Sequence, residues 1–129
     1  MKTETTIRVR YNECDSMGVV HHAVYPVWFE IGRTELLRVQ GKTYRSLEQQ
    51  GVYLVVSDLV IKYKKPAKYD DELILETEVS HYSPARITHS YELRNEDSII
   101  ATAQTVLACV DCEGRVQRVP EYLCKKNER

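Results

Sequence analysis

A loop rich in turn-forming residues carries the carboxylate that is best placed to do chemistry. Asp15 lies within residues 12–18, where asparagine, aspartate, serine and glycine break the preceding strand pattern. A helical pattern follows, and its first N–H groups, around His22 and Ala23, should be free and carry partial positive charge. A carboxylate beside such donors could attack a carbonyl carbon or activate water, while the donors stabilise the oxygen that becomes negative.

The residues around Asp15 also fit an ordinary turn. Aspartate before serine and near glycine commonly bonds the local backbone, and such turns are frequent. An aspartate with an unshifted pKa of about 3.9 is a poor base at neutral pH, so a catalytic Asp15 would need partial burial. Local sequence alone therefore favours the ordinary turn.

Basic residues at separate places in the sequence could bind an anionic ligand. Lys64 and Lys65 follow a predicted strand, Arg86 follows a turn signal, and Arg118 lies near the C-terminus. Each of them, taken singly, is typical of a solvated surface charge. The net charge of −1 creates no overall attraction for nucleic acid or an anionic membrane, so an anionic ligand would depend on such local groups.

The cysteines do not have the spacing of a metal site. Cys109 and Cys112 form a C-x-x-C pair with no second pair and no histidine nearby, so a closed zinc site lacks ligands. The first residues lack the apolar stretch of a signal peptide, and no apolar run approaches the length of a membrane span. We therefore expect a cytoplasmic protein with reduced thiols, no membrane span and no metal.

A long helix is predicted directly after the loop that holds Asp15. Residues 23–39 place apolar side chains at helical spacing. The predicted buried stripe consists of Val24, Val27, Trp28 and Ile31. Glu30 and Arg33 have the i,i+3 spacing of an ion pair on the remaining surface. A short second helix is expected over residues 44–50.

The rest of the chain has the pattern of strands. Residues 6–11 alternate, which predicts a strand with Ile7, Val9 and Tyr11 on one face. Later strands are predicted over residues 52–63, 73–82, 85–94, 99–110 and 115–119. One long helix covers only one face of such a sheet, so we expect an α+β fold in a single domain, residues 1–129, whose sheet wraps around the helix or pairs with another subunit. The exposed edge strand favours a dimer.

Several of these segments together resemble the signature of a known enzyme family. YNECDSMGVVHH (residues 11–22), EIGRTE (30–35) and YKKPAKYDDE (63–72) are similar to the 4-hydroxybenzoyl-CoA thioesterase family, especially its short-chain and broad acyl-CoA branch. The resemblance covers nearly the whole chain. It implies a hotdog fold, with an antiparallel sheet of five to six strands around one long helix, and a homodimer or homotetramer. It also implies hydrolysis of an acyl-CoA or acyl carrier protein thioester without a metal or bound cofactor.

The resemblance also assigns roles to individual residues. Asp15 matches the catalytic aspartate, as nucleophile or as general base. His22 aligns with a histidine beside the oxyanion position, where it could bond the thioester or Asp15, or only orient the helix start. The implied substrate-binding residues are Gly18, Tyr25, Lys64, Lys65, Arg86 and Arg118. Tyr25 and Trp28 are also typical of core residues.

Other interpretations remain open from sequence. A second lineage of hotdog thioesterases uses a helix glutamate near the position of Glu30, which would be the next candidate if Asp15 were dispensable. A hotdog hydratase or dehydratase would need a catalytic histidine paired with an acid. A non-catalytic acyl-CoA-binding protein would bind the ligand without turnover. The acyl group, the carrier, and the choice between dimer and tetramer cannot be derived from the sequence.

Overall fold

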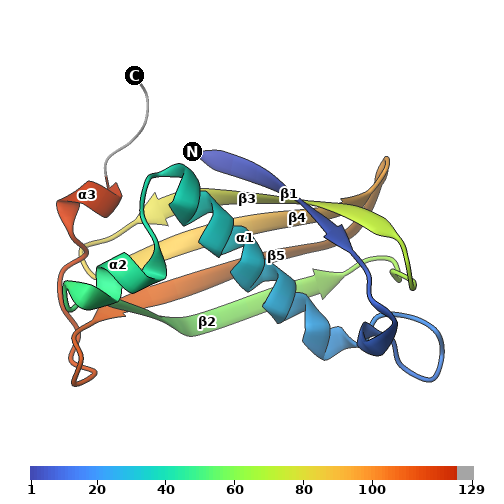
Figure 1. The fold of residues 1–129 in the computed structure, drawn as a ribbon, viewed down its shortest axis with the longest axis horizontal. Helices are drawn as coiled ribbons and strands as arrows, with labels where there is room; N and C mark the ends of the chain where they lie inside the picture. Colours follow the sequence, from blue (N-terminus) through green and yellow to red (C-terminus); the bar gives the residue numbers. More distant parts are fainter. Residues whose placement is uncertain (125–129) are drawn as a thin grey trace.

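The computed structural model describes residues 1–124, which form a five-stranded antiparallel sheet around one long helix (Figure 1). The strands are β1 (Lys2–Arg8), β2 (Tyr53–Tyr63), β3 (Glu72–Tyr82), β4 (Arg86–Asn95) and β5 (Ser98–Val110). They lie in the order β1-β3-β4-β5-β2, so β1 and β2 are the two edges of the sheet. The predicted α+β hotdog architecture is confirmed.

The two predicted helices form in the predicted order, and a third, which was not predicted, follows near the C-terminus. α1 (Tyr25–Val39) crosses one face of the sheet, α2 (Tyr44–Gln49) follows it, and α3 (Glu121–Cys124) lies near the C-terminus (Figure 1). Two short 3-10 turns, η1 (Tyr11–Glu13) and η2 (His22–Val24), flank the loop that holds Asp15. Thr43 caps α2 by accepting from Ser46 N–H at 3.0 Å. Within residues 1–124, no helix has the length and apolar content that crossing a membrane requires.

The buried face of α1 is not the predicted one. Trp28 is buried as expected, but Val27 is 51% exposed and Ile31 is 39% exposed. The buried side of α1 consists of Tyr25, Trp28, Phe29, Gly32, Arg33, Leu36 and Leu37. Gly32 allows this packing, because a Cβ there would lie 2.2 Å from Thr77 Oγ1. The helix therefore approaches β3 through its glycine and leaves Val27 and Ile31 uncovered.

The predicted last strand, residues 115–119, does not form. Val116 makes only an isolated bridge to Val110. The Val119 N–H then donates to Pro84 O at 2.7 Å. The segment therefore does not extend the sheet, because its backbone N–H groups bond first to Cys109 on β5 and then to Pro84 in the turn between β3 and β4.

Candidate active site

The Asp15 side chain is exposed and held by its own loop. Its Oδ1 accepts the N–H of Met17 at 2.8 Å and that of Val19 at 3.4 Å. Gly18 has a φ of +82°, which glycine adopts without strain, and its N–H donates to Asp15 O at 3.0 Å. This is the ordinary turn that the local sequence favours. None of the hydrogen bonds within residues 1–124 uses Asp15 Oδ2, so one carboxylate oxygen is free for chemistry.

An open pocket of about 480 Å³ surrounds this loop, and Asp15 and Gly18 both line it. Tyr11 and Tyr69 line it too, and their rings meet edge to face with centroids 5.5 Å apart. The prediction that Tyr11 shares the buried strand face was wrong, because β1 ends at Arg8 and Tyr11 is 79% exposed. Two exposed aromatic rings therefore lie beside the candidate carboxylate.

The buried carboxylate of Glu13 ties the loop to α1. Glu13 is 7% exposed; Oε1 accepts the Arg10 N–H at 2.7 Å, and Oε2 accepts from Trp28 Nε1 at 3.1 Å. Its backbone oxygen accepts from the His21 N–H at 3.0 Å. A buried carboxylate is tolerated only when its oxygens are bonded. The sequence analysis missed Glu13, although its spacing from Arg10 is that of an i,i+3 ion pair.

The start of the helical segment offers one donor fewer than predicted. The Ala23 N–H is not free, because it donates to His21 Nδ1 at 3.1 Å. His21, for which no role was expected, is thus the N-cap of η2. No hydrogen bond within residues 1–124 uses the His22 N–H. The ring of His22 stacks on that of His21, with centroids 4.3 Å apart.

A second open pocket, of about 310 Å³, brings His22, Tyr25, Lys64 and Lys65 together. Tyr63 donates its hydroxyl to His22 O at 2.9 Å and meets the Tyr25 ring edge to face at 5.0 Å. Burial, together with the neighbouring Tyr63, raises the pKa of Tyr25, so its phenol stays protonated at neutral pH. Tyr25 is therefore both a core residue and a pocket wall.

The predicted phosphate-binding residues form two separate groups in one chain. The backbone N–H groups of Lys64 and Lys65 donate to Ile100 O, whereas Arg86 pairs with Ala108. These two positions on β5 are roughly 26 Å apart, at about 3.3 Å per residue. Arg118 lies near the same end of β5 as Arg86, because its backbone oxygen accepts from the thiol of Cys109, the residue after Ala108 on β5. The four basic residues therefore do not form one cluster in the isolated chain.

Comparison with known proteins identifies the family. A family model described as the thioesterase-like superfamily matches residues 9–126. The chain belongs to the thioesterase-like superfamily. Acyl-CoA thioesterase YbgC of Haemophilus influenzae is 42% identical over 106 residues, which cover 81% of this chain and 78% of that protein. Acyl-CoA thioester hydrolase YbgC of Escherichia coli O6:H1 is 32% identical over 106 residues, with 81% and 79% covered.

Solved structures agree with this family. A DHNA-CoA thioesterase from Staphylococcus aureus superposes with a TM-score of 0.89 at 33% identity, over 95% of this chain and 84% of that one.

Among residues 1–124, no three His, Cys, Asp or Glu side chains gather as a metal site would require.

This member of the thioesterase-like superfamily has a further carboxylate on α1, Glu30. It is exposed and lines a separate pocket of about 230 Å³ together with Arg33. The ion pair predicted between Glu30 and Arg33 is not among those formed within residues 1–124. Arg33 instead points into the core, where its Nη1 donates to the Tyr91 hydroxyl at 3.1 Å.

Proposed function

We propose that this chain hydrolyses the thioester of an acyl-CoA to the free acid and CoA, with Asp15 as the reacting carboxylate. The observation that carries the proposal is the Asp15 loop, in which one carboxylate oxygen is bonded by the backbone and the other is free. The similarity to two proteins named as acyl-CoA thioester hydrolases supports the reaction. Placement in the narrower 4-hydroxybenzoyl-CoA thioesterase branch is part of this proposal and rests on the block at residues 11–22.

The proposed mechanism uses only side chains, backbone donors and water. The thioester oxygen would accept from the His22 N–H, the donor left unpaired at the start of the helical segment. In one route Asp15 attacks the acyl carbon, the C–S bond breaks and CoA leaves as the thiolate, and water then hydrolyses the anhydride. In the other route Asp15 takes a proton from water as this water attacks the acyl carbon, the C–S bond breaks, and the proton passes to the departing CoA sulfur. Both routes need the free Asp15 oxygen near the same carbon, and neither needs a metal or cofactor.

We further propose that two copies pair through their β2 edges to complete the site. The exposed apolar residues of β2 are Val55, Val56, Leu59 and Val60, between 39% and 50% exposed. On α1, Val27 and Ile31 are exposed as well. A large uncovered apolar surface beside a free strand edge is typical of an interface.

Pairing of two β2 strands about a two-fold axis would be antiparallel. The C-terminal end of β2 in one copy, with Lys64 and Lys65, would then lie beside the N-terminal end of β2 in the other copy. Arg86 and Arg118 lie at that opposite end. The basic groups that are separate in one chain would then face one CoA from two copies. For a catalytic Asp15, the partner copy must also cover the exposed loop and supply the partial burial that a catalytic carboxylate requires.

The test compares CoA release from acetyl-, hexanoyl-, palmitoyl-, phenylacetyl- and benzoyl-CoA by the wild type and by Asp15→Asn. Release is followed by chromatography, because the thiols of the protein would react with a thiol dye. Asp111→Asn is a matched control, since Asp111 Oδ1 also accepts from the N–H groups two and four residues later. We expect kcat to fall about 10³-fold or more in Asp15→Asn only.

Each other outcome has a distinct meaning. Equal losses in both variants would reduce Asp15 to a structural turn residue. Unchanged turnover in Asp15→Asn would move the chemistry to Glu30 or His22. Acyl-CoA binding without turnover in the wild type would favour a non-catalytic binding protein or an acyl carrier protein substrate.

A further inference from the structure

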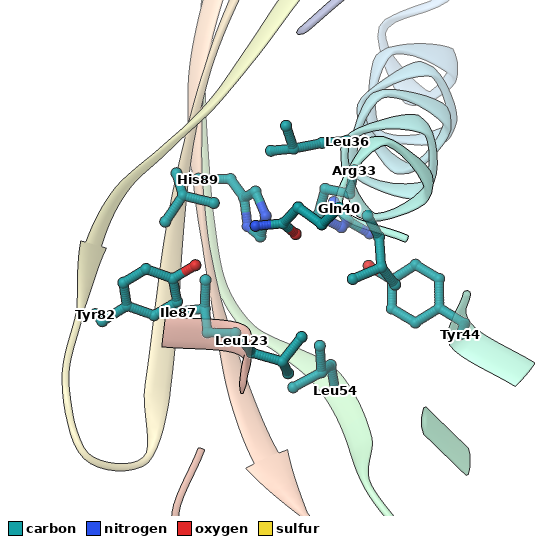
Figure 2. A pocket seen from close by; sticks show the side chains of 11 residues that line it. Arg33, Leu36, Gln40, Tyr44, Leu54, Tyr82, Ile87, His89 and Leu123 are labelled. Atoms are coloured by element: carbon teal, nitrogen blue, oxygen red, sulfur yellow. The ribbon is translucent and has the colours of Figure 1, made fainter. Parts of the chain in front are cut away.

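A small cavity lies between the second half of α1 and the inner face of the sheet (Figure 2). Its volume is about 20 Å³. Its polar lining consists of Arg33, Gln40, Tyr44, Tyr82 and His89, and the rest is leucine, isoleucine and valine. It shares no residue with the pockets around Asp15 and His22. The cavity is therefore separate from the proposed active site.

The polar lining of this cavity is rich in donors and contains no carboxylate. Arginine has only donors and remains charged, and the amide, phenol and imidazole side chains each carry a donor as well. Figure 2 shows Arg33, Gln40 and His89 reaching into the same space from α1 and from the sheet. The chemistry of the lining therefore favours a negatively charged occupant.

Arg33 and His89 are buried, and each has a side-chain nitrogen without a partner within residues 1–124. Arg33 is 8% exposed and His89 is 6% exposed. Within residues 1–124, neither Arg33 Nε nor His89 Nδ1 has a hydrogen-bond partner. The Tyr91 hydroxyl, which accepts from Arg33, is neutral and is itself bonded to Thr105 at 2.6 Å. A buried guanidinium without an opposite charge is unfavourable, so this site calls for an anion.

The site carries one positive charge at neutral pH. Burial, with the nearby charge of Arg33, lowers the pKa of His89 to about 3. The imidazole is then neutral and still has one ring N–H to donate. An occupant with a single negative charge would therefore balance the site.

We propose that this cavity binds a single halide ion between Arg33 and His89. A cavity needs about 10–15 Å³ to hold one water molecule, so 20 Å³ suits one water or one monatomic ion. A carboxylate or an acyl chain is too large. A water molecule would bond the free donors but would leave the charge of Arg33 unbalanced. The rival sources of negative charge are Glu30 and Glu48, which line an open pocket together with Arg33.

The solution test follows thermal unfolding in sodium chloride, bromide and gluconate at equal ionic strength. At a halide concentration roughly tenfold above the Kd, we expect the Tm in chloride or bromide to be about 3–6 °C higher than in gluconate. Arg33→Met should lose this difference, and Glu30→Gln, the matched control on the same helix, should keep it. The same shift in Arg33→Met would overturn the proposal. Halide dependence that arises only in Glu30→Gln would also overturn it, by identifying Glu30 as the counter-ion.

A crystal of the wild type grown in bromide tests the position without relying on any variant. We expect an anomalous difference peak between Arg33 and His89. A water molecule there, or no peak, would overturn the proposal. A peak without a halide-specific Tm shift would mark an adventitious ion only, and would overturn it too.

Discussion

The N-terminal end of α1 and its second half each bury a charged side chain, but they pair that charge differently. At the N-terminal end, Glu13 is 7% exposed and its carboxylate accepts from Arg10 and Trp28. In the second half, Arg33 is 8% exposed and its Nε has no partner within residues 1–124. Buried ions are tolerated where bonds and opposite charge replace water.

The difference indicates what each region is built to do. The paired Glu13 holds a loop, and the free carboxylate oxygen lies on Asp15, two residues later. The site for chemistry is thus exposed, while its support is buried and complete. The buried charge of Arg33 has no opposite charge beside it among its hydrogen-bond partners, so the proposed halide ion would supply that charge.

Lowering the pH should affect the region around Arg33 most strongly. Burial, with the nearby Arg33 charge, lowers the pKa of His89 from 6.5 to about 3. Between these values the unfolded chain binds a proton that the folded chain does not, so stability is lost as the pH falls. We expect His89 to contribute a loss of up to about 5 kcal/mol between pH 6.5 and 3. Urea unfolding at a series of pH values measures it.

Two histidine variants isolate this contribution. His89→Gln should flatten the dependence of unfolding free energy on pH in this range. His81→Gln is the control, because His81 is exposed and should leave the wild-type slope unchanged. Equal slopes in the wild type and His89→Gln would show that His89 titrates normally, and that the interior is wetter than its burial indicates.

Removing the paired charge should cost less but should also affect turnover. Glu13→Leu leaves the buried N–H groups of Arg10 and Trp28 without an acceptor, which we expect to lower the unfolding free energy by about 2–3 kcal/mol. Glu35→Leu is the control, because Glu35 has the same i,i+3 spacing to Arg38 but is 42% exposed, and it should cost less than about 0.5 kcal/mol. Urea unfolding and kcat are measured for both variants. Equal losses would show that burial of Glu13 has no special role.

Local pattern was enough to predict α1, α2 and the five strands of the sheet, but it wrongly predicted a strand over residues 115–119 and did not show which side chains meet. The alternation of β1 and the helical spacing of α1 depend on neighbours in sequence, and both elements form. Arg33 illustrates the limit, because its partner Tyr91 lies 58 residues away. An i,i+3 rule favoured Glu30, and nothing local indicated that Arg33 faces inward.

The candidate site was predictable only where its residues are neighbours in sequence. Asp15 and Gly18 lie within one loop, so a sequence block brings them together. Lys64 and Arg86 were grouped by function, yet the register of strand pairing places them beside opposite ends of β5. The strand order also places β2 at an edge of the sheet, where its exposed apolar residues lie beside unpaired backbone groups.

The smallest expected effect concerns a single bond. Trp28→Phe keeps an aromatic ring in the core, but it removes the Nε1–H donor to Glu13 and makes the side chain smaller. We expect kcat on an acyl-CoA to fall several-fold with little change in KM, because the Asp15 loop would be less firmly placed against α1.

A double-mutant cycle separates this bond from the smaller size of phenylalanine. If Glu13 and Trp28 position the loop through their shared hydrogen bond, the activation free energy for kcat should rise less in the double variant than the sum of the rises in the two single variants. We expect this coupling to be about 1 kcal/mol. The cavity left by the missing ring would instead have the same effect on kcat whether Glu13 is present or replaced by leucine. Additive losses would therefore mean that Trp28 supports α1 only by packing, and that Glu13 holds the loop through Arg10 alone.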